Sequence, residues 1–572
     1  MPIESAVQRM VHAFEQGSLK IWVQRAMIAT IVCSLSGFWI SNKFNGFNQP
    51  EAMDQAQIAR QIARGQGYST LYIRPLALRL MSRDGEDAPA PLPDVSQPPL
   101  GPLTSAILLR LGGKYLEVKP GRAVSPAEQV IATAGILFFA ATLGICFFLG
   151  QILFDRRTAF LASGLIIATA IMWRFATSGL PQMAMTFFFN ASLLVLVGAL
   201  QSKAQKQSGR TVALAALSAF LLGVTTLGHG AMCWVFPGFW VFAVVVLTPR
   251  VPVAAVTIPA YLLPLLPWAW HNWQVMGQPL GLPIYELCRS AGESKLALMA
   301  DFEPILRFHL ADFLQNTSAQ MVDQLEGLFG FLGQNVVAAA FFFAVFLHPF
   351  GRWIPAQLRW AVLAMWLGAF VGMSIAGVEG VVSANQLHVL FLPIMILYGL
   401  DFLMLIWRAI GLNQPLLRTA FLVLLYAISA MPLVQAVTTK TPRLNWPPYV
   451  PPLVVQFSKW IQPDEAMASD IPWATAWYAE RTSLLLPTSV AQFEFIHYQR
   501  LLHAPLVAIY LTPMSGGART SGDIMTGRYR DWSRFITRDI TALELKDWIL
   551  KAAVNLPVDG QCVFFADRIR WR

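Results

Sequence analysis

The feature that most constrains this chain is a series of long apolar runs that contain almost no charge. They lie at about 21–41, 130–153, 158–173, 183–200, 211–228, 231–248, 252–270, 336–350, 360–376, 387–407 and 419–437. Several approach the ~20 residues that a helix needs to cross the hydrocarbon core of a bilayer. Only 13% of the 572 residues are charged, against about 25% in a typical soluble domain. We therefore expect a polytopic, all-α membrane protein with about eleven transmembrane helices.

The charges between these runs predict which ends of the helices face the cytoplasm. Basic residues precede the first run and then collect in every second loop, at Arg9, Lys20, Arg25, Arg156, Arg157, Lys203, Lys206, Arg210, Arg250, Arg352, Arg359, Arg408 and Arg418. The short loops at 174–182, 228–230 and 377–386 contain one basic residue, Arg174. Because cytoplasmic loops are enriched in Lys and Arg, we expect a protein of a bacterial inner membrane with a cytoplasmic N-terminus. The net charge of +10 then concerns orientation and membrane lipids, not nucleic acid.

That orientation places three long segments together on the outer side of the membrane, at 42–128, 271–335 and 438–572. Residues 1–437 form the expected transmembrane domain. The tail begins with a proline-rich linker at 441–452, and short apolar runs follow at 484–486, 506–511 and 562–565. Such runs, separated by helix-like segments, indicate strands. We therefore expect a small extracytoplasmic C-terminal α/β domain.

A short helix is predicted at the start of the first outer segment. Pro50 suits the first turn of a helix, and Gly65 suits the position just beyond its end. Glu51 and Asp54 lie three residues apart, so both carboxylates share one helix face near the positive N-terminal end. These residues alone allow two interpretations. The pair can take a proton from a hydroxyl group, or Glu51 can simply cap the helix beside a solvated Asp54.

Four further segments, taken in order, form a set of motifs. They are Ala59-Arg60-Gln-Ile-Ala-Arg64-Gly65-Gln-Gly67-Tyr68, Gln97-Pro98-Pro99-Leu100, the stretch from Leu266 to Gly281 that contains Pro267-Trp268 and His271-Asn272, and the stretch from Asn385 to Pro393. The set resembles the motifs of the C-type membrane glycosyltransferases. Among these, the motifs of the chain most resemble those of the protein O-mannosyltransferases and the lipid A aminoarabinose transferase.

The resemblance implies an enzyme that moves a sugar from a polyprenyl-phosphate donor to an acceptor on the outer side, with inversion at the anomeric carbon. The acceptor hydroxyl needs a carboxylate base, and the leaving lipid phosphate needs positive charge or hydrogen-bond donors. Glu51 falls on the position of the family's usual aspartate, and Asp54 lies one turn later, so both are candidate catalytic residues. The resemblance implies no cofactor besides the lipid-linked sugar. The acceptor can be a glycan, a lipid or a protein.

Several basic residues are expected at or near the outer interface and are candidates for binding the donor phosphate: Arg60, Arg64, Arg74, Arg174, His271 and His388. Two of them have ordinary alternatives. Arg174 can extend toward lipid headgroups, and His388 can be a structural residue at the mouth of a helix. Many relatives have a second acidic motif near the position of Leu180–Met183, but this chain has no carboxylate there. We therefore expect no required metal.

Two other classes of function compete with the enzyme. A transporter or lipid flippase would show internal repeats and charges at the bilayer midplane, whereas the apolar runs of this chain are nearly free of charge. A transferase-like scaffold without activity is the second alternative, because the motifs depart from the family pattern. The acidic residues collect in the outer segments, and this favours the enzyme.

Overall fold

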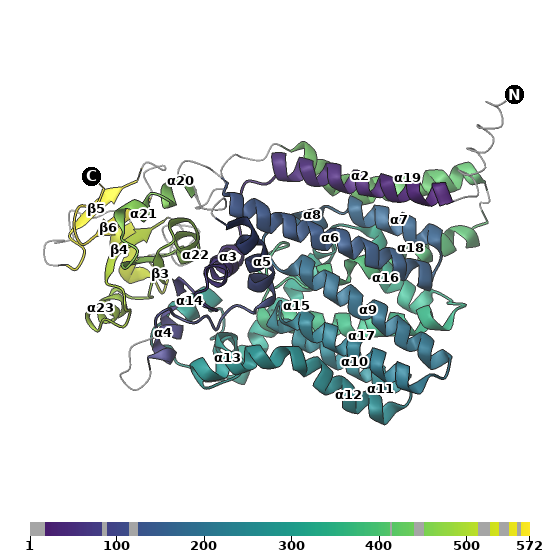
Figure 1. The fold of residues 1–572 in the computed structure, drawn as a ribbon, viewed down its shortest axis with the longest axis horizontal. Coiled ribbons are helices and arrows are strands. Elements are labelled where there is room, and N and C mark those ends of the chain that lie inside the picture. The colour runs from purple at the N-terminus through teal and green to yellow at the C-terminus, as the bar shows by residue number, and fades with distance from the viewer. Residues whose placement is uncertain are drawn as a thin grey trace.

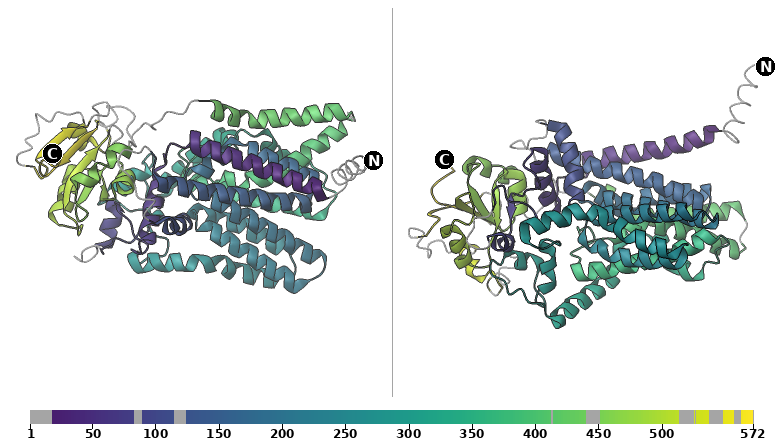
Figure 2. Two further views of the ribbon diagram at one scale, coloured as in Figure 1. Left: turned by 45° about the horizontal axis from the view of Figure 1, so that its top comes forward. Right: turned by 60° about the horizontal axis from the view of Figure 1, so that its bottom comes forward.

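The computed structural model describes residues 18–82, 89–113, 124–411, 414–439, 451–512, 525, 527–536, 548–556 and 562–571. A bundle of long helices forms one part of the molecule, and a β-sheet with short helices forms the other. The sheet lies beyond one end of the bundle in every view (Figures 1 and 2). Short helices from the first long loop lie between the two parts (Figure 1).

Seven helices of the described residues are long and apolar enough to cross a membrane. They are α6 (Pro126–Leu153), α9 (Gln182–Ala204), α10 (Ser208–Thr226), the continuous stretch Arg250–Met276 that contains α12 (Arg250–Leu262) and α13 (Leu266–Met276), α17 (Trp353–Ala376), α18 (His388–Ala409) and α19 (Pro415–Thr438). Shorter apolar helices lie at Ala26–Asn42, within α2 (Ser18–Asn42), at Leu100–Gly112 (α5), and at Gly230–Val246, which includes α11 (Val235–Val246). The expectation of a polytopic helical protein is confirmed.

The expected number of eleven spans is not confirmed. Two further spans arise only if bent pairs are counted, α7 (Arg156–Ala168) with α8 (Ala170–Thr177), and α15 (Leu310–Phe331) with α16 (Val336–Leu347). The bends are 62° and 116°. The described helices therefore give seven spans, or nine with these pairs. Apolar composition did not predict these pairs, because α15 carries Asp312, Asp323 and Glu326 and lies in a segment expected outside the membrane, whereas α16 is wholly apolar.

Small residues allow the helices of the bundle to approach closely. A Cβ at Gly399 of α18 would lie 1.8 Å from the carbonyl oxygen of Val337 in α16, and a Cβ at Gly223 of α10 would lie 2.2 Å from that of Tyr261 in α12. Helices within membranes gain much of their packing energy from such close approach. These glycines therefore set the spacing of the bundle that carries the outer segments.

The sheet has six strands in the order β1-β3-β2-β4-β6-β5. Their bounds are β1 Tyr72–Ile73, β2 Ala466–Ser469, β3 Thr482–Leu485, β4 Leu506–Leu511, β5 Ala552–Asn555 and β6 Val563–Ala566. The first four strands in this order are parallel, and β6 pairs antiparallel with both β4 and β5. The expected α/β tail is confirmed, with one addition that the sequence did not predict. The first long loop supplies the edge strand β1, so the tail and that loop share one sheet.

Candidate functional site

The helix α3 (Pro50–Ala63) lies at the junction between the bundle and the sheet (Figure 1). Pro50 occupies its first turn, no side chain caps its N-terminus, and Gly65 follows with a φ of +81°. The predicted helix and its two ends are thus confirmed. Ten consecutive residues, from Ala52 to Gln61, are buried, which is unusual for a polar sequence. Polar side chains that are buried need partners, and the partners of α3 define the candidate site.

Asp54 is fully engaged by neighbouring side chains. Its Oδ2 accepts hydrogen bonds from Arg74 Nη2 at 2.5 Å and from Gln97 Nε2 at 2.8 Å, and its Oδ1 accepts one from Gln57 Nε2 at 3.1 Å. The side chain is 1% exposed. Burial works against the charged form of Arg74, but Asp54, Tyr72 and Asp94 outweigh it and raise the pKa of Arg74. Asp54 and Arg74 therefore form a buried ion pair that fixes the first long loop on α3.

Hydrogen bonds of three residues, Asp94, Tyr68 and His271, fix the loop segment around Gln97. Asp94 Oδ2 accepts a hydrogen bond from the backbone N–H of Gln97 at 2.8 Å, and the hydroxyl of Tyr68 donates to the carbonyl of Gln97 at 2.7 Å. His271 Nε2 lies 2.8 Å from the carbonyl oxygen of Asp94, and its ring stacks on Trp268. Three of the sequence motifs therefore meet at this point. His271 thus contacts the backbone of the first long loop through the carbonyl of Asp94.

Glu51 differs sharply from Asp54. Glu51 as a whole residue is half-buried, and among the described residues no other residue donates a hydrogen bond to its carboxylate. Burial raises the pKa of Glu51; its own backbone N–H opposes the shift, Glu379 adds to it, Lys295 opposes it and Asp54 adds to it. A carboxylate that no neighbouring side chain binds and that is more basic than usual has the properties of a general base.

Lys295, the first residue of α14 (Lys295–Ala300), lies within the electrostatic range of Glu51. Its Nζ lies 2.9 Å from Glu286 Oε2. His229 is also within the electrostatic range of Lys295, and its Nε2 lies 2.7 Å from Asn385 Oδ1. Burial lowers the pKa of His229 to about 4, and Lys295 contributes to this shift, so the imidazole is neutral near pH 7. One ammonium group of the second long loop is therefore within the electrostatic range of Glu51.

Arg60 and Arg64 bind the sheet part of the molecule. Arg60 Nη1 donates to the carbonyl of Trp477 at 2.8 Å and to Glu480 Oε1 at 3.0 Å, and Nη2 donates to the carbonyl of Ala476 at 2.8 Å. Burial lowers the pKa of Arg60 to about 10, which Glu480 opposes. Arg64 Nη1 lies 2.8 Å from Glu480 Oε2, with its side chain 45% exposed. Both arginines thus join α3 to the short π-helix η6 (Thr475–Ala479) and the residue after it.

The last two predicted residues lie in different surroundings. Arg174 is exposed on α8, and within the described part of the chain no hydrogen bond or ion pair occupies its guanidinium. His388 is fully buried at the first position of α18, where Trp366 Nε1 donates to its Nδ1 at 3.0 Å. Among the residues that the structure describes, none forms a hydrogen bond with the Nε2 of His388. Arg174 is therefore open to a ligand, and His388 is enclosed by aromatic rings.

Sequence reasoning did not single out Lys295, Glu379 or Glu128. Glu128, near the start of α6, is fully buried, and its Oε1 accepts hydrogen bonds from the Tyr478 hydroxyl at 2.6 Å and from Trp477 Nε1 at 3.1 Å. A signal for Glu128 was present, because Ser125 and Glu128 have the spacing of a capping box. Lys295 has no comparable signal in the sequence around it.

No group of three His, Cys, Asp or Glu side chains that could hold a metal ion occurs in the described ranges. The expectation that no metal is required stays a prediction.

Comparison with known proteins defines the fold further. No protein-family model matches the sequence, and no curated protein matches it. Solved structures do match. ArnT from Cupriavidus metallidurans in the apo state has a TM-score of 0.60 at 11% identity and covers 96% of this chain and 99% of its own. ArnT bound to undecaprenyl phosphate gives 0.56 at 11% identity, covering 96% and 98%.

The oligosaccharyltransferase AglB from Archaeoglobus fulgidus, in complex with an inhibitory peptide and a dolichol-phosphate, has a TM-score of 0.53 at 13% identity. The match covers 86% of this chain and 70% of AglB. At these identities the likeness shows the fold. The fold expected from the sequence motifs, that of the C-type glycosyltransferases, is confirmed.

Proposed function

We propose that this chain is a membrane glycosyltransferase that moves a sugar from a polyprenyl-phosphate donor to an acceptor hydroxyl on the outer side of the membrane. The observation that carries the proposal is the difference between the two acids of α3. Asp54 is held by Arg74, Gln97 and Gln57, whereas Glu51 is partly open, lies near Lys295 and has a raised pKa. The ArnT fold, solved with undecaprenyl phosphate, supports a lipid-linked donor.

In the proposed reaction Glu51 is the general base. Its carboxylate removes the proton of the acceptor hydroxyl as that oxygen attacks the anomeric carbon of the donor. The bond between this carbon and the phosphate oxygen breaks, and the lipid phosphate leaves with the electron pair. A single displacement of this kind inverts the anomeric configuration. The raised pKa of Glu51 strengthens it as a base.

The developing charge on the leaving phosphate requires a cation, and Lys295 is a candidate because it interacts electrostatically with Glu51. Arg174 is a second candidate, because its guanidinium has no hydrogen bond or ion pair within the described part of the chain. Arg74 binds Asp54, and Arg60 and Arg64 bind Glu480. We propose that these three, with His271, shape the site, and that His388 supports the bundle beneath it.

The test is transfer by the purified full-length protein in lipid nanodiscs. A set of synthetic polyprenyl-phosphate sugars would be offered with candidate acceptors, and release of polyprenyl phosphate would be followed by mass spectrometry. The proposal expects release with at least one donor, and expects the reaction to depend on Glu51. Lipid movement between leaflets without cleavage of any donor would instead support a flippase.

A further inference from the structure

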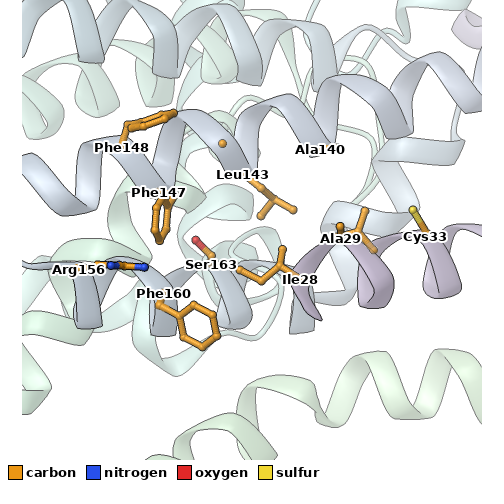
Figure 3. Close-up of a pocket in the computed structure, with 12 residues that line it drawn as sticks. Ile28, Ala29, Cys33, Ala140, Leu143, Phe147, Phe148, Arg156, Phe160 and Ser163 are labelled. Carbon is orange, nitrogen blue, oxygen red and sulfur yellow. The ribbon is translucent and has the colours of Figure 1, made fainter. Parts of the chain in front are cut away.

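An apolar cleft of about 460 Å³ opens between α2, α6 and α7 (Figure 3). Ile28 and Cys33 of α2, Leu143 and Phe147 of α6, and Phe160 of α7 line it. Arg156, the first residue of α7, lies at one end of the cleft, and Cys33 lies toward the other (Figure 3). The cleft thus combines a long apolar wall with a single guanidinium at its end.

The cleft opens far from the candidate active site. Glu128, at the start of α6, accepts a hydrogen bond from the backbone N–H of Phe47, just before α3. Arg156 follows the opposite end of α6. A helix of 28 residues, with a rise of ~1.5 Å per residue, is on the order of 40 Å long, and the hydrocarbon core is about 30 Å thick. Glu51 and Arg156 therefore belong to opposite membrane surfaces, and a phosphate at Arg156 is out of reach of Glu51.

Positive charge is concentrated around the Arg156 end of the cleft. Arg157 is the next residue and is exposed, and both Arg157 and Arg408 lie within the electrostatic range of Arg418. Arg352 Nη1 donates to the carbonyl of Phe154 at 2.8 Å, which brings a further arginine to the same turn. The nearby carboxylate of Asp155 accepts a hydrogen bond from the backbone N–H of Thr158 at 2.7 Å, as the N-cap of α7. Basic pockets between transmembrane helices, on the surface where the short loops are basic, bind anionic lipid headgroups.

We infer that this cleft binds an anionic phospholipid of the leaflet opposite to Glu51, with an acyl chain along α2, α6 and α7 and its phosphate at Arg156. The apolar wall suits an acyl chain, because a chain in the cleft keeps apolar surface in contact with apolar surface. The cluster of arginines selects a negative headgroup over a zwitterionic one. This inference does not depend on the proposed transferase activity.

The glycine at position 144 provides a direct way to fill the cleft. Gly144 lines the cleft, and a Cβ added there meets nothing within 4 Å. A larger residue in the middle of a helix also has a better helix propensity than glycine. Gly37 of α2 is a matched control, because it is helical, outside the cleft lining, and likewise has nothing within 4 Å of an added Cβ.

The experiment is native mass spectrometry of the full-length protein released from vesicles of equimolar phosphatidylglycerol and phosphatidylcholine. The wild-type protein should retain phosphatidylglycerol preferentially. Gly144→Phe should lose the retained lipid, with Gly144→Leu as a smaller second variant, and Gly37→Phe should retain it. Arg156→Gln should weaken retention of phosphatidylglycerol roughly tenfold, the size expected for one charge-assisted contact, and should leave phosphatidylcholine unaffected.

Three results would overturn the inference. The first is equal retention of the two phospholipids by the wild-type protein. The second is unchanged retention in a folded Gly144→Phe or Gly144→Leu protein, judged by a melting temperature like that of Gly37→Phe. The third is displacement of phosphatidylglycerol by an added polyprenyl monophosphate at equal concentration, which would assign the cleft to the isoprenoid lipid. None of these results bears on Glu51, so the transferase proposal is tested separately.

Discussion

Arg74 Nη2 lies 2.5 Å from the Oδ2 atom of Asp54, with both side chains buried in the junction between the helical bundle and the sheet. Arg74 directly precedes α4 (Pro75–Met81) and follows β1. This one ion pair therefore connects three elements, namely α3, β1 and α4. Asp54 is committed to this ion pair, whereas no hydrogen bond from another described residue occupies the carboxylate of Glu51, and this difference is why we propose Glu51 as the base.

Glu51→Gln should reduce turnover by roughly 10²–10⁴-fold, the usual size of an acid–base contribution. The amide keeps the shape of the side chain and removes its basicity, so binding of the lipid donor should be retained. The melting temperature should stay near that of the wild-type protein, because no other described residue donates a hydrogen bond to the carboxylate. Glu326→Gln, an exposed carboxylate of α15, is the control. Full activity of Glu51→Gln would remove Glu51 as the base.

Asp54→Asn should act first on stability. Breaking a buried ion pair by removing one partner costs about 3–5 kcal/mol, because the charge of Arg74 is left without its counterion. We expect a lower melting temperature in detergent and a loss of activity that follows the loss of folded protein. If Asp54→Asn were stable but inactive while Glu51→Gln stayed active, Asp54 would be the base, one helical turn after Glu51.

Labelling of single cysteines tests the orientation derived from the loop charges. In a protein whose five native cysteines have been replaced, Ser290→Cys should react with an impermeant thiol reagent from the outer side, and Lys206→Cys should not. Both positions are exposed on the protein surface. A difference in their reaction with the reagent therefore reports the side of the membrane on which each lies. Sites at 85, 413 and 520 would extend the test, although they lie outside the described residues. Reaction of Lys206→Cys in sealed cells would reverse the assignment of the candidate site to the outer side.

Local sequence signals predicted those parts of the fold that local physics determines. The bounds of α3 followed from Pro50 and Gly65, and apolar length identified the helical bundle. The strands β3, β4 and β6 followed from short apolar runs in the tail. In each case the signal lies within the element itself, as a hydrophobic periodicity, a helix-capping residue or an apolar run.

Contacts between distant segments could not be predicted in this way. Arg60 meets Glu480 across 420 positions of sequence, and local sequence gives no sign that this arginine joins two parts of the fold. The strand β1 has two residues, Tyr72 and Ile73, which is too short to show any alternation. Lys295 belongs to the second long loop and comes within the electrostatic range of Glu51 of the first, because α14 packs against α4. Such residues become visible once the topology is known.

Glu128→Leu should separate the sheet part from the bundle more severely than Tyr478→Phe. The carboxylate of Glu128 accepts hydrogen bonds from Tyr478, Trp477, Ser125 and Phe47. Each buried donor left without an acceptor costs about 1–3 kcal/mol, whereas losing one ordinary bond costs about 1 kcal/mol. Limited proteolysis should cut Glu128→Leu near the linker before Pro451 faster than it cuts Tyr478→Phe. Equal resistance of the two variants would show that other contacts hold the junction.

The pH dependence of transfer provides a test in which two neighbours of Glu51 act in opposite directions. A general base works only when ionised, so the rate should fall as the pH drops through the pKa of Glu51, and the raised pKa moves this fall above the usual range of a glutamate. Glu379 raises that pKa and Lys295 lowers it. Glu379→Gln should therefore shift the acid limb of kcat/KM to lower pH, and Lys295→Met should shift it to higher pH. Lys295→Met should also lower the plateau rate, since it removes a cation that we propose stabilises the leaving phosphate, whereas Glu379→Gln should leave the plateau unchanged. If the two variants shifted the acid limb of kcat/KM in the same direction, or if neither shifted it, the limb would report the ionisation of a group other than Glu51.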